Sequence, residues 1–339
     1  MEDIINDFIK NGRREILIIG DIYNYRRRMS NNFIKFIDYL RDNLDNYDFK
    51  YFDEEKDIET KKDKGEKVCY DIYEIIKIAN CKTSSPIVWV CDHRGCWMVS
   101  GLNKYNGIKI LDIEDLCGKD DIIISHITSS EYNYVFYKIE NEFMTRLRTM
   151  FPLIKYKQYD HYIDEKIFRD YNLEKEYDVI CYGTVDYGIY PFRERLFKLL
   201  KEQKDIKVKI IEHPRYGYSN DRIHNIIDKN LAIEINKAKI GISTPSVYEM
   251  FLKKYIEIGL CGCCLAGRFP KDKEEEYRGG IIDLKEDMSD DEILNKIKYY
   301  LKDSDERIKI TKHMKNILEN RYTFENGRKV FTDILEKTI

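Results

Sequence analysis

Residues 240–266 carry the pattern that most restricts what this chain can fold into. An apolar run, Ile240–Ile242, is followed by Pro245 and then by residues with helical spacing as far as Gly259. Small apolar residues, Cys263–Ala266, come next and have the pattern of a second strand. A strand, a turn, a helix and a strand in this order are the repeating unit of a parallel α/β sheet. The segment therefore predicts an α/β fold.

Two glutamates in this segment, Glu249 and Glu257, have seven residues between them. On one continuous helix they would lie about 12 Å apart along the axis and roughly 80° apart around it, and could contact opposite ends of one elongated ligand. Ser246-Val-Tyr-Glu249 also fits a capping box, which would explain Glu249 by helix stability alone. Glu257 lies in the last turn, where the helix dipole disfavours an anion, so a ligand contact and a solvated surface position are both open.

The Glu-x7-Glu spacing and the small-residue strand after it resemble the donor half of GT-B glycosyltransferases, most closely the "glycosyl transferases group 1" type and its retaining, CgeB-like branch. The resemblance covers residues 177–335 well and the N-terminal half only in outline. It implies two Rossmann-like domains that face each other across a cleft. It also implies that Glu257 binds the ribose hydroxyls of the donor nucleotide and that Glu249, near the donor sugar, is catalytic. Ser246 and Tyr248 would bind the donor as well.

The length and charge of the chain restrict its class and its partners. A chain of 339 residues is long enough for two domains, each with its own core. Charged residues make up 35% of it, but the net charge is only −3, so no overall basic bias favours nucleic acid as a partner. No apolar run predicts a transmembrane segment, and the Met-Glu-Asp start lacks the pattern of a signal peptide. These features predict a cytoplasmic protein.

Neither the cysteines nor the acidic motifs predict a metal site. The nine cysteines lie mostly in apolar surroundings, as reduced buried thiols do. Cys91-Asp-His93-Arg-Gly-Cys96 could supply three ligands, but no Cys-x2-Cys pair with a partner pair occurs. Asp303-Ser-Asp305 has the spelling of an Asp-x-Asp site, but it lies between two predicted helices and reads as a turn and a cap. We therefore expect no metal and no cofactor, with the nucleotide sugar as a substrate.

Residues 1–160 predict one Rossmann-like domain, which the resemblance places on the acceptor side. Apolar runs at 16–19, 49–52, 86–91, 108–111 and 122–124 predict strands, and helical spacing occurs at 31–44 and 68–79. Gly20 is not part of a G-x-G-x-x-G motif, which argues against an NAD enzyme. Asp92 and His93 follow a predicted strand, where His93 could contact the donor sugar and Asp92 could act as a catalytic base if the enzyme inverts. A turn with a satisfied histidine is the structural alternative.

Residues 161–320 predict a second Rossmann-like domain, and residues 321–339 predict a final helix. The resemblance to GT-B proteins implies that this second domain binds the nucleotide sugar and that the helix returns to the first domain. A strand at 177–182 leads into the loop Gly183-Thr-Val-Asp-Tyr-Gly188 and then into a helix at 192–202. A loop in this position can bind phosphate with its amides and the helix dipole, and this one lacks the Gly-Lys-Ser/Thr ending of an ATPase P-loop. Gly183 is therefore a donor-binding candidate.

Basic residues near this loop would neutralise the departing nucleoside diphosphate, as the resemblance implies. The candidates are Arg193 and Arg195 at the start of the helix, and His213 and Arg215 after the strand at 207–212. The usual Arg…Lys pair of the family is not present in its ordinary form, so which arginine serves is open. Each arginine could instead be a surface residue in an ion pair.

Together these observations predict a hexosyltransferase-type enzyme that moves a sugar from a UDP- or GDP-sugar to a hydroxyl of a glycan, a protein or a small molecule. Most of the rate acceleration would come from stabilising the leaving diphosphate with cations and amides, without a metal ion. Two alternatives stay open: a nucleotide-sugar epimerase of the same fold, and a non-catalytic sugar-nucleotide-binding subunit of a larger assembly. The epimerase would need more acid and base groups than the sequence offers.

Overall fold

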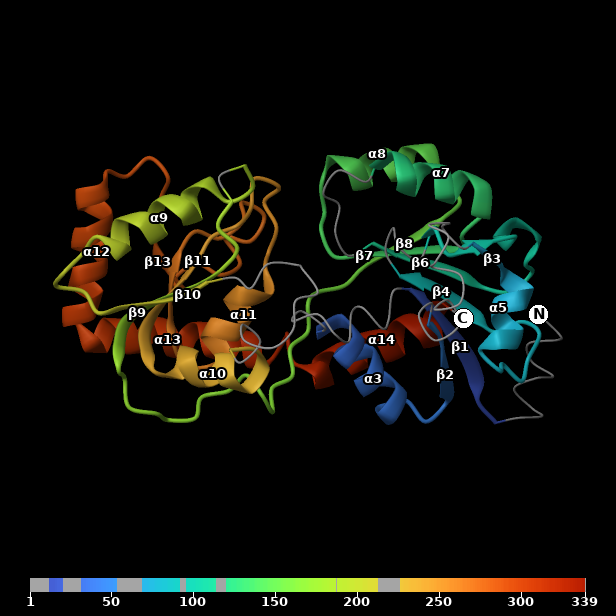
Figure 1. The fold of residues 1–339 in the computed structure, drawn as a ribbon, viewed down its shortest axis with the longest axis horizontal. Helices are drawn as coiled ribbons and strands as arrows, with labels where there is room; N and C mark the ends of the chain where they lie inside the picture. The colour runs from blue at the N-terminus through green and yellow to red at the C-terminus, as the bar shows by residue number, and fades with distance from the viewer. Residues whose placement is uncertain are drawn as a thin grey trace, which may run out of the picture. The chain divides into compact units, whose positions relative to one another are not determined.

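The computed structural model describes residues 12–20, 32–53, 69–91, 96–113, 120–186, 188–212 and 226–338. The chain divides into two compact units, Met1–Asp160 with Arg328–Ile339, and His161–Gly327. Each unit is built around its own parallel sheet with helices on both faces (Figure 1). The predicted α/β class is therefore confirmed.

The first unit contains a six-stranded sheet with the order β2-β1-β4-β6-β7-β8. Its strands are β1 (Arg14–Gly20), β2 (Tyr47–Asp53), β4 (Ile87–Cys91), β6 (Lys109–Ile113), β7 (Tyr134–Tyr137) and β8 (Lys155–Gln158), and all neighbours are parallel. A smaller parallel pair joins β3 (Tyr70–Asp71) to β5 (Val99–Ser100). The central strands read as continuous apolar runs, such as Ile16–Ile19, because both of their faces are buried.

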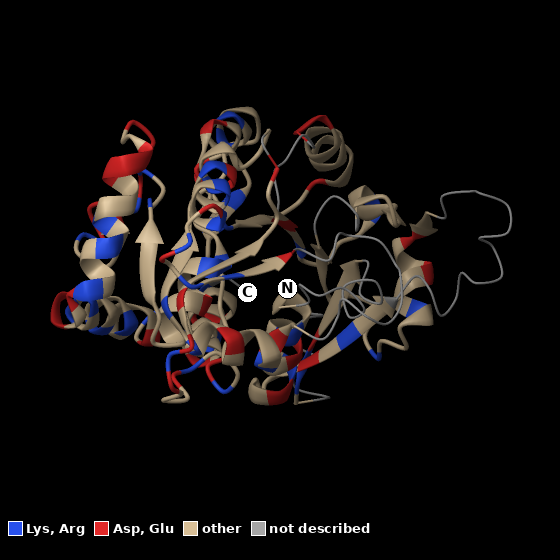
Figure 2. Cartoon of the chain, turned by 60° about the vertical axis from the view of Figure 1, so that its left-hand side comes forward, with Lys and Arg blue, Asp and Glu red and all other residues tan. Residues whose placement is uncertain are grey.

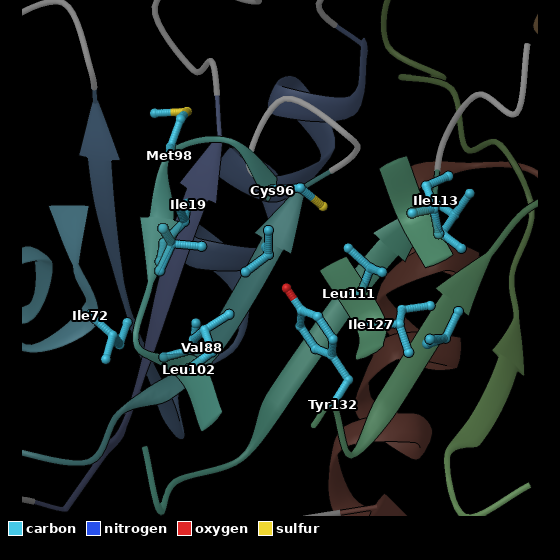
Figure 3. Packing of buried hydrophobic residues seen from close by; sticks show 14 of the residues in the cluster. Ile19, Ile72, Val88, Cys96, Met98, Leu102, Leu111, Ile113, Ile127 and Tyr132 are labelled. Atoms are coloured by element: carbon cyan, nitrogen blue, oxygen red, sulfur yellow. The ribbon is translucent and has the colours of Figure 1, made fainter. Parts of the chain in front are cut away.

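The helices of this unit are α3 (Asn32–Asn43), α5 (Ile72–Ile78), the short 3₁₀ turn η2 (Leu102–Lys104), α7 (Asp120–Ser130) and α8 (Glu142–Met150). Figure 3 shows side chains of one face of the sheet, among them Ile19, Val88 and Leu111, in one cluster with Ile127 of α7. The predicted strand at 122–124 is wrong, because these residues belong to α7. Ile123 and Ile127 are buried one helical turn apart, and a short apolar run alone cannot distinguish the two structures.

The second unit contains a five-stranded parallel sheet with the order β10-β9-β11-β12-β13. Its strands are β9 (Tyr177–Gly183), β10 (Val208–Glu212), β11 (Ala238–Ser243), β12 (Cys264–Gly267) and β13 (Ile282–Asp283). Its helices are α9 (Pro191–Lys201), α10 (Asp228–Asn236), α11 (Lys253–Leu260), α12 (Asp290–Lys302) and α13 (Ser304–Glu319). Helices α9 and α12 cover one face of the sheet, and α10, α11 and α13 cover the other (Figure 1).

Acidic and basic side chains are mixed along the described helices rather than separated into regions of one sign (Figure 2). This pattern agrees with a chain that is 35% charged yet carries a net charge of only −3. Within the described ranges, no helix combines the length and the apolar composition that crossing a bilayer requires.

The last helix, α14 (Phe324–Thr338), contributes a fully buried phenylalanine to the core of the first unit. Phe331 stacks on Trp89 at 5.4 Å between ring centroids and packs edge-on against Phe36 and Tyr159. The indole Nε1 of Trp89 and the hydroxyl of Tyr159 both donate hydrogen bonds to the buried carboxylate of Asp112. The helix therefore packs against a core that contains a buried carboxylate with two hydrogen-bond donors.

We expect Phe331→Ala to destabilise the first unit by about 3–5 kcal/mol, because it opens a cavity between the rings of Phe36, Trp89, Phe136 and Tyr159. Both tryptophans of the chain, Trp89 and Trp97, belong to this unit, so tryptophan fluorescence during urea unfolding reports on it selectively. Val330→Ala, at a side chain that is 39% exposed on the same helix, is the matched control. Equal urea midpoints for the two variants would show that α14 is not needed for this core.

Candidate functional site

The second unit has a topological switch point between β9 and β11. The chain runs from β9 outward to β10 and then crosses to β11 on the other side of β9. In open α/β sheets, ligands bind outside the carboxyl ends of the strands at such a point, because the two following loops diverge there. The two loops here are residues 184–190, before α9, and residues 244–252, before α11. They are joined by a hydrogen bond from the Val247 amide to the Ile189 carbonyl, at 2.9 Å.

The structure corrects the predicted helix from Pro245 to Gly259, because α11 begins only at Lys253. Residues 244–252 form an irregular loop in which Glu249 has a left-handed backbone, with φ of 53°. The Ser246 hydroxyl accepts a hydrogen bond from the Tyr248 amide, at 3.2 Å, instead of capping a helix with Glu249. The predicted capping box and the helical spacing of the two glutamates are therefore wrong. The side chains of this loop bind residues far along the chain, and those contacts outweigh local helix propensity.

Glu249 forms a bidentate ion pair with Arg268, which directly follows β12. The two oxygen–nitrogen distances are 2.7 and 2.8 Å, and the Lys271 amide donates a third hydrogen bond at 3.0 Å. The hydrogen bonds from Arg268 are the main reason why the pKa of Glu249 lies below its ordinary value. Glu249 is therefore a carboxylate whose charge is already neutralised inside the protein.

Glu257 is buried on α11, with 4% of its surface exposed, and this excludes the solvated surface position. One carboxylate oxygen accepts a hydrogen bond from the Tyr182 hydroxyl at 2.8 Å, and the other lies 3.9 Å from the Lys253 ammonium. Tyr182 is the penultimate residue of β9, next to Gly183. The two motif glutamates therefore differ in kind: Glu249 is bound in a strong ion pair, while Glu257 keeps an oxygen with only a weak neighbour.

Arg193 is fully buried under the two loops. Its guanidinium donates hydrogen bonds to the carbonyls of Thr184 and Thr244, at 3.1 and 2.8 Å, and the Tyr190 ring covers it at 3.8 Å. None of the described carboxylates pairs with it, and burial lowers its pKa. Arg193 therefore ties the carboxyl ends of β9 and β11 together and places a positive charge beneath both loops.

Arg195 points away from these loops. Its guanidinium pairs with Asp290 and donates to the carbonyls of Glu286 and Met288, so all three of its nitrogens are used. These contacts fasten α9 to the segment before α12. They favour the structural interpretation of Arg195 over the donor-binding one.

Lys254, in the first turn of α11, is a cation that the sequence analysis missed. Its ammonium occupies the place where a side chain at Gly183 would begin, 2.0 Å from that position, and lies 5.4 Å from the centre of the Tyr182 ring. Burial of the ammonium, reinforced by the charge of Arg193, lowers the pKa of Lys254 to about 7. A pair of lysines at a helix N-terminus, where cations are disfavoured, was the signal in the sequence that could have revealed it.

Gly183 is required by this arrangement for two reasons. Its φ of 97° lies in the region that favours glycine, and any Cβ would overlap the Lys254 side chain. Among the other candidates, Ser246 is buried and Tyr248 is 48% exposed at the tip of its loop. The remaining candidates, Asp92, His93, His213 and Arg215, lie outside the described residues. Among the residues that are described, no group of three or more metal-binding side chains comes together.

The comparisons with known proteins agree with this geometry. Residues 193–329 match the family described as glycosyl transferase-like, and no curated protein matches the chain. Sucrose-phosphate synthase from Thermosynechococcus elongatus is similar in structure, with a TM-score of 0.59 at 12% identity over 96% of this chain and 99% of that one.

Two further solved structures have the same architecture. Anabaena Alr3699/HepE in complex with UDP has a TM-score of 0.59 at 8% identity, over 96% of this chain and 100% of that one. A trehalose-6-phosphate synthase has a TM-score of 0.54 at 13% identity, over 99% and 96%. Structural matches at such low sequence identity establish a shared fold and nothing more. The family match is separate evidence from the sequence, and it covers most of the second unit. The chain therefore has the GT-B fold of glycosyltransferases, and its residues 193–329 carry the glycosyl transferase-like sequence pattern.

Proposed function

We propose that this protein is a glycosyltransferase that moves a hexosyl group from a nucleoside-diphosphate sugar to an acceptor hydroxyl without a metal ion. The observation that carries the proposal is a pair of cations at the switch point of the second unit, the fully buried Arg193 and the partly buried Lys254. Neither cation is paired with a described carboxylate within ion-pair distance. Buried charge that is not neutralised inside a protein is costly, so an anionic ligand is the expected partner.

A nucleoside diphosphate fits this site by charge and by position. Helices α9 and α11 both begin at the two loops, so the positive ends of their dipoles add to the two cations. During sugar transfer, negative charge grows on the leaving diphosphate, and fixed cations in a water-poor site stabilise that charge strongly. Lys254 would contact the diphosphate, and Arg193 would act from beneath the loops.

Glu257 is the candidate ligand for the ribose of the donor. A carboxylate can accept hydrogen bonds from two neighbouring hydroxyls, and such charge-assisted bonds are stronger than neutral ones. The Tyr182 hydroxyl binds one oxygen of Glu257 and thereby fixes the orientation of the carboxylate. Tyr248 and Ser246, on the neighbouring loop, remain donor-binding candidates.

The donor class is supported by the fold relatives, since Anabaena Alr3699/HepE has been solved with UDP, with UDP and glucose, and with UDP-glucose. We propose a UDP-sugar as the first donor to test, followed by a GDP-sugar. The acceptor would be a glycan, a protein or a small molecule. If the enzyme inverts, Asp92 is the candidate base for the acceptor hydroxyl, and His93 is a candidate contact of the donor sugar.

The function is tested by incubating the protein with a panel of UDP- and GDP-sugars and measuring nucleotide release and the fate of the sugar. We expect nucleoside diphosphate to be released from one donor, at an unchanged rate in EDTA, because the two cations replace a metal. Conversion of the donor into its 2-epimer would instead favour the epimerase. Failure of every donor to bind or react would contradict the proposal, and loss of activity in EDTA with recovery in Mg²⁺ or Mn²⁺ would contradict its metal independence.

Lys254→Met is expected to weaken UDP binding and to stabilise the unliganded protein. The pKa of Lys254 is about 7 in the folded chain and higher when unfolded, so between these values the unfolded chain binds more protons. The contribution of Lys254 to stability therefore improves as the pH rises from 7 towards 10, and is least favourable below 7. At pH 6.5, the thermal midpoint of the variant should therefore lie above that of the wild type. The difference between the two midpoints should shrink as the pH rises towards 10.

The matched control is Lys312→Met, which removes an exposed lysine on α13. It should leave UDP affinity unchanged, whereas Lys254→Met should lower it about tenfold or more at pH 6.5, as expected for losing a charged contact. Between pH 6.5 and 9, wild-type affinity should fall as Lys254 loses its proton. Equal pH profiles for wild type and Lys254→Met would show that Lys254 does not contact the diphosphate.

Glu257→Gln is expected to lower UDP affinity roughly tenfold, because hydrogen bonds to a charged group are worth about 1.5–3 kcal/mol and glutamine keeps only one acceptor oxygen. The Tyr182 hydroxyl can still donate to that oxygen, so the thermal midpoint should change little. A ligand without ribose hydroxyls, 2′,3′-dideoxy-UDP, should bind wild type and variant equally. Calorimetric titration measures all four affinities, and an unchanged UDP affinity in Glu257→Gln would exclude the ribose contact.

A further inference from the structure

A chain of ion pairs joins the loops at the carboxyl ends of three neighbouring strands in the second unit. Arg268, directly after β12, lies between Glu249 in the loop after β11 and Glu286 in the segment after β13. It forms the bidentate pair with Glu249, and it binds Glu286 at 3.0 and 3.2 Å through Nη2 and Nε. Because β11, β12 and β13 are adjacent in the sheet, Arg268 holds all three loop segments in one arrangement.

The Glu249 carboxylate has little capacity left for a donor sugar. Its two oxygens accept three hydrogen bonds, two from Arg268 and one from the Lys271 amide. The arginine also neutralises its charge and lowers its pKa, so the carboxylate is a poor base. A residue that contacts substrate usually keeps an unsatisfied atom towards it, and Glu249 uses both oxygens within the protein.

The backbone at Glu249 points to the role of this ion pair. A left-handed conformation, with φ of 53°, is uncommon for a glutamate and is kept only where tertiary contacts enforce it. Two residues later, the Phe251 ring stacks on Tyr255 at 5.0 Å and on Tyr277 at 5.4 Å. The ion pair and the aromatic stack therefore fix the loop at two points, one on each side of Met250, just before Lys254.

We propose that Glu249 is a positioning residue that acts through Arg268, and that this pair holds loop 244–252 and the start of α11 in the donor-binding conformation. The inference rests on the proposed function, since the donor is the ligand whose binding the loop would control. It replaces the direct contact between Glu249 and the donor sugar that the family resemblance implies. Arg268 thereby becomes a residue that determines donor affinity without touching the donor.

A double-mutant cycle tests the proposal, with UDP affinity measured by calorimetry for wild type, Glu249→Gln, Arg268→Met and the double variant. If Glu249 acts only through Arg268, each single variant loses about tenfold in affinity and the double variant loses no more than either. If Glu249 contacts the donor directly, its substitution lowers the affinity again in the Arg268→Met background. Losses that multiply to about a hundredfold would therefore overturn the proposal. A purely structural role would lower the thermal midpoint but leave the affinity of the folded protein unchanged, and that result would overturn it too.

Amide hydrogen exchange of residues 244–252, measured without nucleotide, makes the test independent of the donor. Exchange should increase to the same extent in both single variants and in the double variant. The matched control is Arg278→Met, which removes an exposed ion pair with Glu275 and should change neither exchange nor affinity. Unchanged exchange in Arg268→Met would overturn the inference even if wild type binds UDP. Increased exchange in a protein that binds no nucleotide would instead contradict the proposed function and leave the loop-positioning role supported.

Discussion

The arrangement of the second unit depends on the burial of positive charge at the switch point of its sheet. Arg193 is fully buried, and its two terminal nitrogens donate to main-chain carbonyls that leave its charge unneutralised, while its Nε has no hydrogen-bond partner among the described residues. Lys254 places a second cation against Gly183. Burial of its ammonium lowers the pKa of Lys254, and the positive charge of Arg193 lowers it further. Two cations held so close are unfavourable for folding alone, and such perturbed groups concentrate at functional sites.

Other charges around this centre are used to build the loops rather than to bind a ligand. Arg195 and Arg268 both attach to the segment around Glu286, one through its carbonyl and the other through its carboxylate. The arginines that neutralise carboxylates are therefore distinguishable from the cations that do not. A charged residue that is already paired with a carboxylate has little electrostatic free energy left to offer a ligand. Pairing therefore distinguishes charges that hold the loops from charges that could bind a ligand, and closeness to a sequence motif does so less well.

Sequence reasoning identified the fold class because buried parallel strands must be apolar along their whole length. The runs at 16–19 and 179–182 were recognisable for this reason, and so was the strand–helix–strand order around β11 and β12. The strand predicted at 122–124 failed because three consecutive isoleucines satisfy both a strand and a buried helix. In the structure, the acidic residues at the start of α7 and the spacing of Ile123 and Ile127 identify the helix.

The sequence alone determined the α/β fold, the strand-end position of Gly183 and the presence of two glutamates seven residues apart. Only the tertiary structure decided which charges are neutralised. Local pattern assigned Glu249 to a helix cap, yet Arg268, nineteen residues later, draws it into a left-handed turn. Lys254 was passed over because its significance comes from Gly183, a residue on another strand. Spacing along a chain fixes which residues share an element, but burial and ion pairing depend on neighbours that only the folded chain brings together.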